Sequence, residues 1–403
     1  MNYRKALLAG LLFILLFVGE SIALHNQFTT SNPGGNDFYS RWAGARALLV
    51  EGRDPYGLDV TAEIQVAKGL DPALEGKGSF AYPLHVVFLF LPLSYFSYAW
   101  AQAIWMVTLQ WVVVALVFLL FHYARWRSSL LALTGMMLAA LLMYPVARSI
   151  LLGQFTLHVT LFLVGILLAL RNSRDGWAGI LLAATSVKPQ MVVLIGPWFL
   201  FWALAHKRWR FIWGLLGGGA VMFLASLPLF PRWPISFIED IQRYAKVAGG
   251  KNPLVVLVEQ VWPGAGEPVQ AILTAVLLLV VLWAWRRGMR NDGERPFRQA
   301  AYWTIIASLL ILFQTGTTNQ TLLLIPLFDW LNRLRVRQAG TAGTWLMAIV
   351  MLILVIFPWA LFLQTIEGNL ENPLLFLPLP LLSLIVLAGI EISQWRAARR
   401  QAV

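Results

Sequence analysis

Long apolar runs alternate with short polar stretches along the whole chain. A membrane-spanning helix needs roughly 20 apolar residues. Runs that reach or approach this length lie at 6–24, 99–121, 129–145, 156–170, 177–205, 211–230, 268–285, 299–315, 319–331, 344–363 and 375–392. The run at 177–205 is interrupted by "VKPQ", and a proline inside a helix breaks it, so we expect two short helices that meet at Lys188 and Pro189. The pattern predicts an all-α polytopic membrane protein with about 12 spans.

Composition supports this class and excludes others. Of the 403 residues, 59% are hydrophobic and 12% are charged, whereas a soluble domain carries about 25% charged residues. The net charge of +12 could suggest nucleic acid, but the chain has no basic run and no soluble domain that would bind it. The absence of Cys excludes disulfides, thiolate catalysis and Cys-ligated metals. We read residues 1–403 as a single integral membrane domain.

The distribution of charge predicts the topology. If the N-terminus is cytoplasmic, the short inner loops and both ends hold 20 of the 31 Lys and Arg residues, as the positive-inside rule requires. A span at 82–97 would invert every later loop, so we expect a re-entrant or interfacial hairpin there. Residues 6–24 could be a signal peptide, but the length of the run and the lack of an A-x-A site favour an uncleaved first helix. We expect a multi-pass protein of the cell membrane with both termini cytoplasmic.

The first outer loop, residues 25–82, is rich in acids and contains seven of the 19 Asp and Glu residues. A helix is predicted near its start, because four apolar positions share one helical face: Phe38, Trp42, Ala45 and Leu49. Arg41 falls off that face. This spacing is typical of a helix that lies in the membrane interface, and "EGRDPYG" ends it with a turn.

Asp37 is the first candidate for chemistry, because it stands at the start of this helix. One reading is structural, with Asn36 or Asp37 as the N-cap of the helix. The other is a carboxylate base at the boundary between water and lipid. The two roles conflict in part, because the helix terminus lowers the basicity of a capping carboxylate. Asp54 is the next candidate for a base.

Lys188 and Arg148 are the candidate phosphate contacts. A lone Lys within a span costs a few kcal/mol and generally faces a cavity or a partner, and broken helices at membrane depth line ligand sites. The alternative is a Lys side chain that extends to the outer interface. Arg148 lies in a very short outer loop, and together the two cations would suit a phosphate.

Uncharged polar residues complete the candidate site. Gln154 could bond a sugar or a phosphate, and Asn319 and Gln320 could orient a hydroxyl-rich ligand or cap the helix that follows. His158 has no second His or acid at metal-binding spacing, and the chain has no DxD, GxSxG or phosphate-binding loop motif. We expect neither a metal nor a cofactor. "GLLGGGAV" at 214–221 predicts close packing between helices.

Several of these stretches, taken in order, resemble glycosyltransferase family 87, whose members are polyprenol-phosphate-mannose-dependent transferases with the GT-C membrane fold. The matching pieces extend over residues 36–215 and read "DFYSRWAGARALLVEGRDPYG", "FAYPLHVVFLFLPLSYFSYAWAQAIW", "GQFTLHVTLFLVGILLAL", "GWAGILLAATSVKPQMVVLIGPWFLFW" and "HKRWR". From residue 216 to the C-terminus the resemblance to the family is weaker.

The resemblance implies a membrane glycosyltransferase that acts on the extracytoplasmic side. Asp37 would be the catalytic base and Lys188 a contact for the lipid phosphate. The family often has a His at the start of the late span, where this chain has "TTNQT", so Asn319 or Gln320 takes that place. Arg41, Arg148 and Gln154 are the other expected substrate contacts.

The implied reaction moves a hexose, with mannose favoured, from a polyprenyl-phosphate donor to a lipid or glycan acceptor. The sugar centre would invert, and Asp37 would accept the proton. A transporter or flippase of a lipid-linked or anionic substrate is the alternative, with the broken helix at Lys188 as its site. We see no inverted repeat, and the acid-rich first loop is unusual for a carrier. A polymerase or ligase of lipid-linked glycans would share the same residues.

Overall fold

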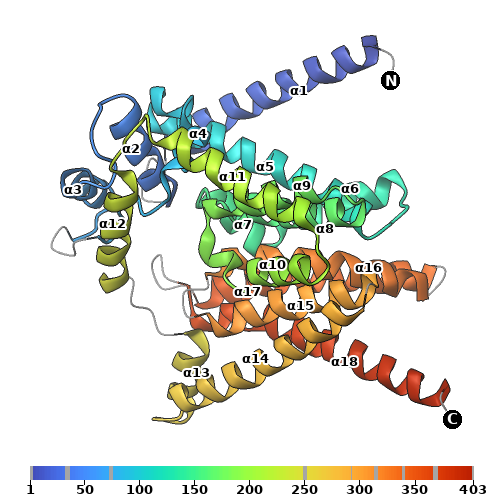
Figure 1. Ribbon diagram of the computed structural model, residues 1–403. Helices are drawn as coiled ribbons and strands as arrows, with labels where there is room; N and C mark the ends of the chain where they lie inside the picture. The colour runs from blue at the N-terminus through green and yellow to red at the C-terminus, as the bar shows by residue number, and fades with distance from the viewer. Residues whose placement is uncertain are drawn as a thin grey trace. The chain divides into compact units, whose positions relative to one another are not determined.

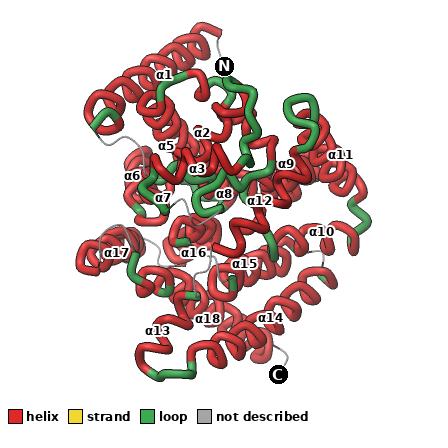
Figure 2. The backbone as a smooth tube through the Cα atoms, turned by 90° about the vertical axis from the view of Figure 1, so that its left-hand side faces the viewer, coloured by secondary structure: helices red, strands yellow, loops and turns green. Residues whose placement is uncertain are grey.

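The computed structural model describes residues 3–31, 37–71, 76–247, 252–291, 293–312, 316–337, 341–365 and 371–401. Every regular element in these ranges is a helix (Figure 2), because a helix satisfies its own backbone polar groups where lipid offers no partner. The chain divides into two compact units. The first contains Met1–Val113, Ser149–Phe155 and Ala220–Gly249, and the second contains Val114–Arg148, Thr156–Gly219 and Gly250–Val403.

Six helices among the described residues are long and apolar enough to cross a membrane: Tyr3–Thr29, Tyr98–Tyr123, Trp209–Ser226, Gly266–Arg290, Trp345–Thr365 and Pro373–Gln394. The pair Leu130–Leu142 and Tyr144–Leu151, bent by 61°, makes a seventh if it is one broken span. The polytopic all-α prediction is therefore confirmed. The expected number of about 12 spans exceeds these six or seven candidate spans, because several of the predicted runs form shorter or interrupted helices.

The first unit combines a long N-terminal helix with short helices from the first loop. Its elements are α1 (Tyr3–Leu24), η1 (His25–Thr29), α2 (Asp37–Leu49), α3 (Leu58–Ala67), η2 (Leu84–Val86), α4 (Val87–Phe90), η3 (Leu93–Tyr95), the start of α5 (Tyr98–Tyr123) and α12 (Trp233–Val247). The helices η2, α4 and η3 are all too short to cross a membrane, so the prediction that residues 82–97 do not span is confirmed.

Helix α2 is enclosed by α3, α4 and η3. Phe38 and Ala45 are fully buried, as their shared face predicts, and Phe38 packs against Phe90 and Trp105. Arg41 was expected off this face, but it is only 2% exposed. The helix therefore buries a residue that does not belong to its apolar face, because the Arg41 guanidinium finds hydrogen-bond acceptors inside the unit.

The second unit is a larger bundle. It contains α6 (Leu130–Leu142), most of α7 (Tyr144–Leu151), α8 (Thr156–Arg171), α9 (Asp175–Ala184), α10 (Ile195–Ala205), most of α11 (Trp209–Ser226), α13 (Pro253–Val261), α14 (Gly266–Arg290), α15 (Glu294–Ile311), α16 (Leu324–Arg337), α17 (Thr341–Thr365) and α18 (Pro378–Gln401). Helices α14 and α15 run side by side (Figure 1), and α15 also contacts α10 and α18. The 3-10 helix η6 (Thr317–Leu323) contacts α8, α15, α16 and α18, and all its residues are buried.

Glycines bring the backbones of α9 and α11 into contact. A Cβ atom added at Gly179 would collide with the carbonyl oxygen of Phe211, and one added at Gly214 would collide with the carbonyl oxygen of Gly176. A Cβ atom added at Gly218 would lie 3.3 Å from the Cα atom of Ile180 in α9, which is a tight contact and not a collision. The close packing predicted from "GLLGGGAV" is therefore confirmed at the positions that face α9.

This contact predicts a stability difference between neighbouring glycines of one helix. Gly214→Ala places a methyl group against rigid backbone, and overpacking of this kind costs about 1–3 kcal/mol. Gly217→Ala is the matched control, because a Cβ atom there meets nothing within 4 Å. In thermal unfolding of the purified protein in detergent, Gly214→Ala should lower the melting temperature and Gly217→Ala should not. Equal melting temperatures would contradict the contact.

Candidate functional site

Asp37 presents a carboxylate that side chains from two other segments hold. The Gln154 side-chain amide donates a hydrogen bond to its Oδ2, and the Lys68 ammonium lies 3.7 Å from its Oδ1. Helix α2 begins at Asp37 itself, which favours a position in the first turn over the N-cap; Asn36 lies outside the described residues. The Asp37 side chain is 45% exposed, so a ligand can reach the carboxylate.

Arg41 fixes the orientation of the Gln154 amide. Its Nη1 donates to the carbonyl oxygen of Gly153 at 2.6 Å. Its Nη2 donates to Gln154 Oε1 at 3.0 Å and to the Tyr82 hydroxyl at 2.6 Å. Because Gln154 Oε1 is the acceptor in this bond, its NH₂ group must point the other way, toward Asp37. Arg41 thus orients the Gln154 amide, and that amide donates the hydrogen bond to the Asp37 carboxylate.

The turn that carries Gln154 approaches α2 closely at Gly153. The φ of this residue is +68°, a conformation that glycine adopts without steric cost, and a Cβ atom here would collide with Phe38. The Gly153 carbonyl oxygen also accepts a bond of 3.0 Å from Trp105 Nε1. Glycine is therefore required for the turn to bring Gln154 to Asp37.

Helix α12 holds the loop that carries Tyr82. Asp240, which is fully buried, accepts a bond of 3.0 Å from the Ala81 backbone N–H. Arg243 donates to Asp240 at 3.4 Å and to the Tyr56 carbonyl oxygen at 2.9 Å. Ala81 has a φ of +47°, which is strained for a residue with a Cβ atom. The bond from Asp240 helps to hold this conformation and with it the neighbouring Tyr82.

Sequence reasoning missed Lys68 and Tyr244. Burial lowers the pKa of Lys68; the Asp37 carboxylate opposes this shift and the Arg41 charge adds to it. Burial raises the pKa of Tyr244 on α12, and the Tyr82 and Asp37 charges raise it further. Both residues lie in ordinary polar stretches without a motif, so only the fold reveals that Lys68 contacts Asp37 and that the Asp37 charge acts on Tyr244.

Arg148 belongs to the second unit and has a carboxylate partner there. Its Nε lies 2.9 Å from Glu371 Oε1. The same carboxylate accepts bonds from the Tyr144 hydroxyl at 2.6 Å and from the Thr317 hydroxyl at 2.8 Å. The sequence suggested an arginine available to a phosphate; in the structure a phosphate would have to compete with Glu371.

Lys188 also lies in the second unit, at the predicted break in the helix. It separates η4 (Thr185–Val187) from η5 (Pro189–Val192), so the expectation of two short helices that meet here is confirmed. The residue is 6% exposed, which argues against a side chain that extends to the membrane surface.

Asn319 and Gln320 lie within η6, inside the second unit, and are 5% and 4% exposed. Neither caps the helix that follows, because η6 continues beyond them. Gln320 Nε2 donates to the Phe376 carbonyl oxygen at 2.9 Å, and Asn319 Oδ1 accepts no hydrogen bond from the described residues. Asp37, Arg41 and Gln154 thus come together in the first unit, whereas Arg148, Lys188, Asn319 and Gln320 belong to the second. The described residues contain no group of three His, Cys, Asp or Glu that could hold a metal ion.

The contact between Asp37 and Lys68 predicts a change in titration. The Asp37 carboxylate raises the pKa of Lys68 against the effect of burial, so Asp37→Asn should lower that pKa further. Reductive ¹³C-methylation of lysines followed by NMR measures it, with Lys68→Arg to assign the signal. Asp59→Asn is the control, since Asp59 pairs with Arg53. An unchanged or higher Lys68 pKa in Asp37→Asn would show that the pair does not form.

The chain is similar to one known protein family. The family model of glycosyltransferase family 87 matches residues 80–312, more than half of the chain. The match includes Tyr82, Gln154 and Lys188, and it begins after α2. No curated protein and no solved structure matches the chain. Together with the polytopic all-helical fold, this extended match shows that the chain belongs to glycosyltransferase family 87 and is a membrane glycosyltransferase.

Proposed function

We propose that the protein transfers a hexose, with mannose favoured, from a polyprenyl-phosphate donor to a lipid or glycan acceptor on the extracytoplasmic side of the cell membrane. The observation that carries this proposal is the Asp37 carboxylate, accessible yet held by Gln154 and Lys68. The positive-inside distribution of Lys and Arg supports cytoplasmic termini and an external first loop. Family membership supports the reaction class.

In the proposed reaction, Asp37 is the general base. The acceptor hydroxyl oxygen forms a bond to the anomeric carbon of the sugar while the bond from that carbon to the phosphate oxygen breaks. The hydroxyl proton passes to the Asp37 carboxylate, and the sugar centre inverts. Polyprenyl phosphate leaves with the bonding electrons, and a phosphate is a good leaving group that needs no proton from the protein.

The positive charges around the carboxylate suit this role. Lys68 lies beside Asp37, and Arg41 orients the Gln154 amide that bonds to it, so the carboxylate is held in one place by two side chains. We assign the phosphate of the donor to Lys188, because a fixed cation stabilises the charge that develops on the leaving group. Arg148 is a weaker candidate for the phosphate because Glu371 already neutralises it.

Asp37→Asn tests the base. Asparagine keeps the volume of the side chain but accepts no proton, and loss of a general base typically costs about 10²–10⁴ in rate. Asp37→Glu should keep partial activity. The assay incubates membranes with radiolabelled polyprenyl-phosphate-mannose and follows the label into acceptors, normalised to folded protein. Asp59→Asn is the control, since Asp59 lies in the same loop and pairs with Arg53.

Two outcomes would contradict this reaction. Full activity of Asp37→Asn would remove Asp37 as the base. Label that the wild-type protein moves across the membrane while it stays on the donor would indicate a transporter or flippase instead.

Lys188→Met tests the phosphate contact in the same assay. Removal of the cation should raise the donor concentration needed for half-maximal transfer, whereas Lys188→Arg, which keeps the charge, should retain part of the activity. The yield of folded protein from detergent chromatography separates this effect from misfolding. If Lys188→Met transferred sugar with the wild-type donor dependence, the residue would not bind the phosphate.

A further inference from the structure

Helices α16, α17 and α18 of the second unit line most of an apolar cavity of about 350 Å³. On α18 its lining runs from Leu379 to Ile390, which is about 16 Å of helix. Other lining residues include Leu327, Trp330 and Leu334 of α16 and Val350 and Leu354 of α17. Small-molecule sites have volumes of about 300–1,000 Å³. A helix, which is about 10 Å wide, would need a larger space, so the dimensions fit one hydrocarbon chain.

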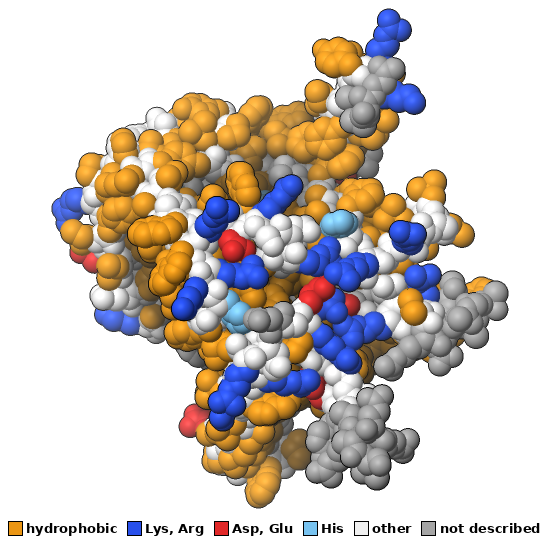
Figure 3. Space-filling model, turned by 45° about the vertical axis from the view of Figure 1, so that its right-hand side comes forward, with side chains coloured by type: hydrophobic (Ala, Val, Ile, Leu, Met, Phe, Trp, Pro, Cys, Tyr) orange, Lys and Arg blue, Asp and Glu red, His pale blue; other side chains and the backbone are white. Residues whose placement is uncertain are grey.

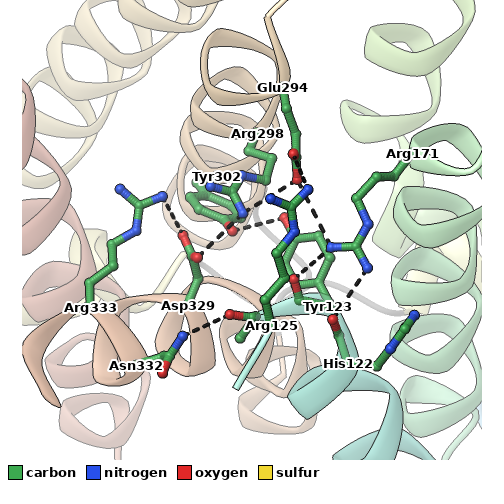
Figure 4. A network of polar contacts seen from close by, with 11 residues as sticks. His122, Tyr123, Arg125, Arg171, Glu294, Arg298, Tyr302, Asp329, Asn332 and Arg333 are labelled. Atoms are coloured by element: carbon green, nitrogen blue, oxygen red, sulfur yellow. Dashed lines mark hydrogen bonds and ion pairs between the residues drawn. The ribbon is translucent and has the colours of Figure 1, made fainter. Parts of the chain in front are cut away.

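Arg333 is the charged residue that lines this cavity. Its carboxylate partner, Asp329, also pairs with Arg298. Asp329 Oδ2 lies 2.9 Å from Arg333, and Asp329 Oδ1 lies 3.4 Å from Arg298 (Figure 4). One carboxylate therefore serves two guanidinium groups. The Arg333 side chain is 34% exposed, so it can reach a further anion.

The network in Figure 4 holds these residues in place. The hydroxyl groups of Tyr123 and Tyr302 are 2.9 Å apart, and the Arg298 guanidinium lies 5.8 Å from the centre of the Tyr123 ring. Asn332 donates to the Ala124 carbonyl oxygen at 2.7 Å. These contacts tie the C-terminal part of α16 to the end of α5 and to α15, so Arg333 belongs to a fixed framework.

Arg295 is a second positively charged residue of this region, and it forms no ion pair with a carboxylate of the described residues. Its pKa is lowered by burial and by the charge of Arg333, with further contributions from Arg287 and Arg298, while Glu391 opposes the shift. Glu391 is itself bonded to Arg287 at 2.6 Å. Figure 3 shows Lys and Arg side chains gathered among hydrophobic ones on one face, with few Asp and Glu between them. An anion beside Arg333 would offset part of this positive charge.

We propose that this cavity, called the lipid groove here, binds one chain of an anionic phospholipid whose phosphate lies at Arg333. The end of α16 belongs to a basic loop that the positive-inside rule assigns to the cytoplasm, and basic pockets between helices on that side suit anionic headgroups. The occupant is therefore a phospholipid of the cytoplasmic leaflet. This site is independent of the transfer reaction and of Asp37.

Thermal unfolding in detergent tests the proposal. A ligand that binds only the folded protein raises the melting temperature, so phosphatidylglycerol should raise that of the wild type by a few degrees more than phosphatidylcholine with the same chains. Arg333→Gln should abolish the difference. Arg127→Gln, which removes an exposed arginine from another predicted cytoplasmic loop, should keep it.

Two further variants keep the test decisive. Arg295→Gln has no described ion pair to lose and should reduce the difference even if Arg333→Gln does not fold. Ser383→Trp fills the lipid groove and should remove the effect of phosphatidylglycerol. Equal shifts with both lipids, or an unchanged difference in Arg333→Gln, would overturn the site. A larger shift with polyprenyl phosphate that depends on Arg333 would overturn the phospholipid assignment.

Discussion

The buried guanidinium of Arg41 organises the first unit. A charge removed from water is costly unless hydrogen bonds compensate for the lost water. Here the two terminal nitrogens donate to the Gly153 carbonyl, the Gln154 amide and the Tyr82 hydroxyl, while Nε is buried without an acceptor among the described residues. The Tyr82 and Phe155 rings lie 4.9 and 5.0 Å from it. These partners come from two segments distant in sequence, so Arg41 can be buried only when both have reached α2. The position of the Asp37 carboxylate depends on that assembly.

Local features of the sequence predicted the elements well. The proline after Lys188 removes a backbone donor and interrupts the helix there, and Gly214 and Gly218 of α11 mark close packing because small residues allow backbones to approach. Hydrophobic length was a weaker guide to the number of spans. The run at 319–331 begins with η6, a 3-10 helix at the centre of the second unit, and hydropathy does not distinguish such a buried segment from the start of a span.

The contacts within the site could not be predicted. Arg148 meets a carboxylate 223 positions away, and Ala81 meets one 159 positions away. A single sequence contains no signal for such pairs. Lys68 lies closer to Asp37 along the chain, but it follows an unremarkable helix and looks like any solvated lysine. Asp37 is a candidate base because it stands at the start of the predicted interfacial helix, and that interpretation needed no tertiary contact.

The choice of an amide at position 154 has a chemical consequence. A glutamate there could still accept the bond from Arg41, but it would place a second carboxylate against Asp37. Two such groups cannot both ionise easily, so they would share a proton, and the shared proton would occupy the oxygen that accepts one from the substrate in the proposed reaction. Glutamine donates its hydrogen bond without titrating. Gln154 therefore fixes the carboxylate in place without adding a second titrating group beside the base that we propose.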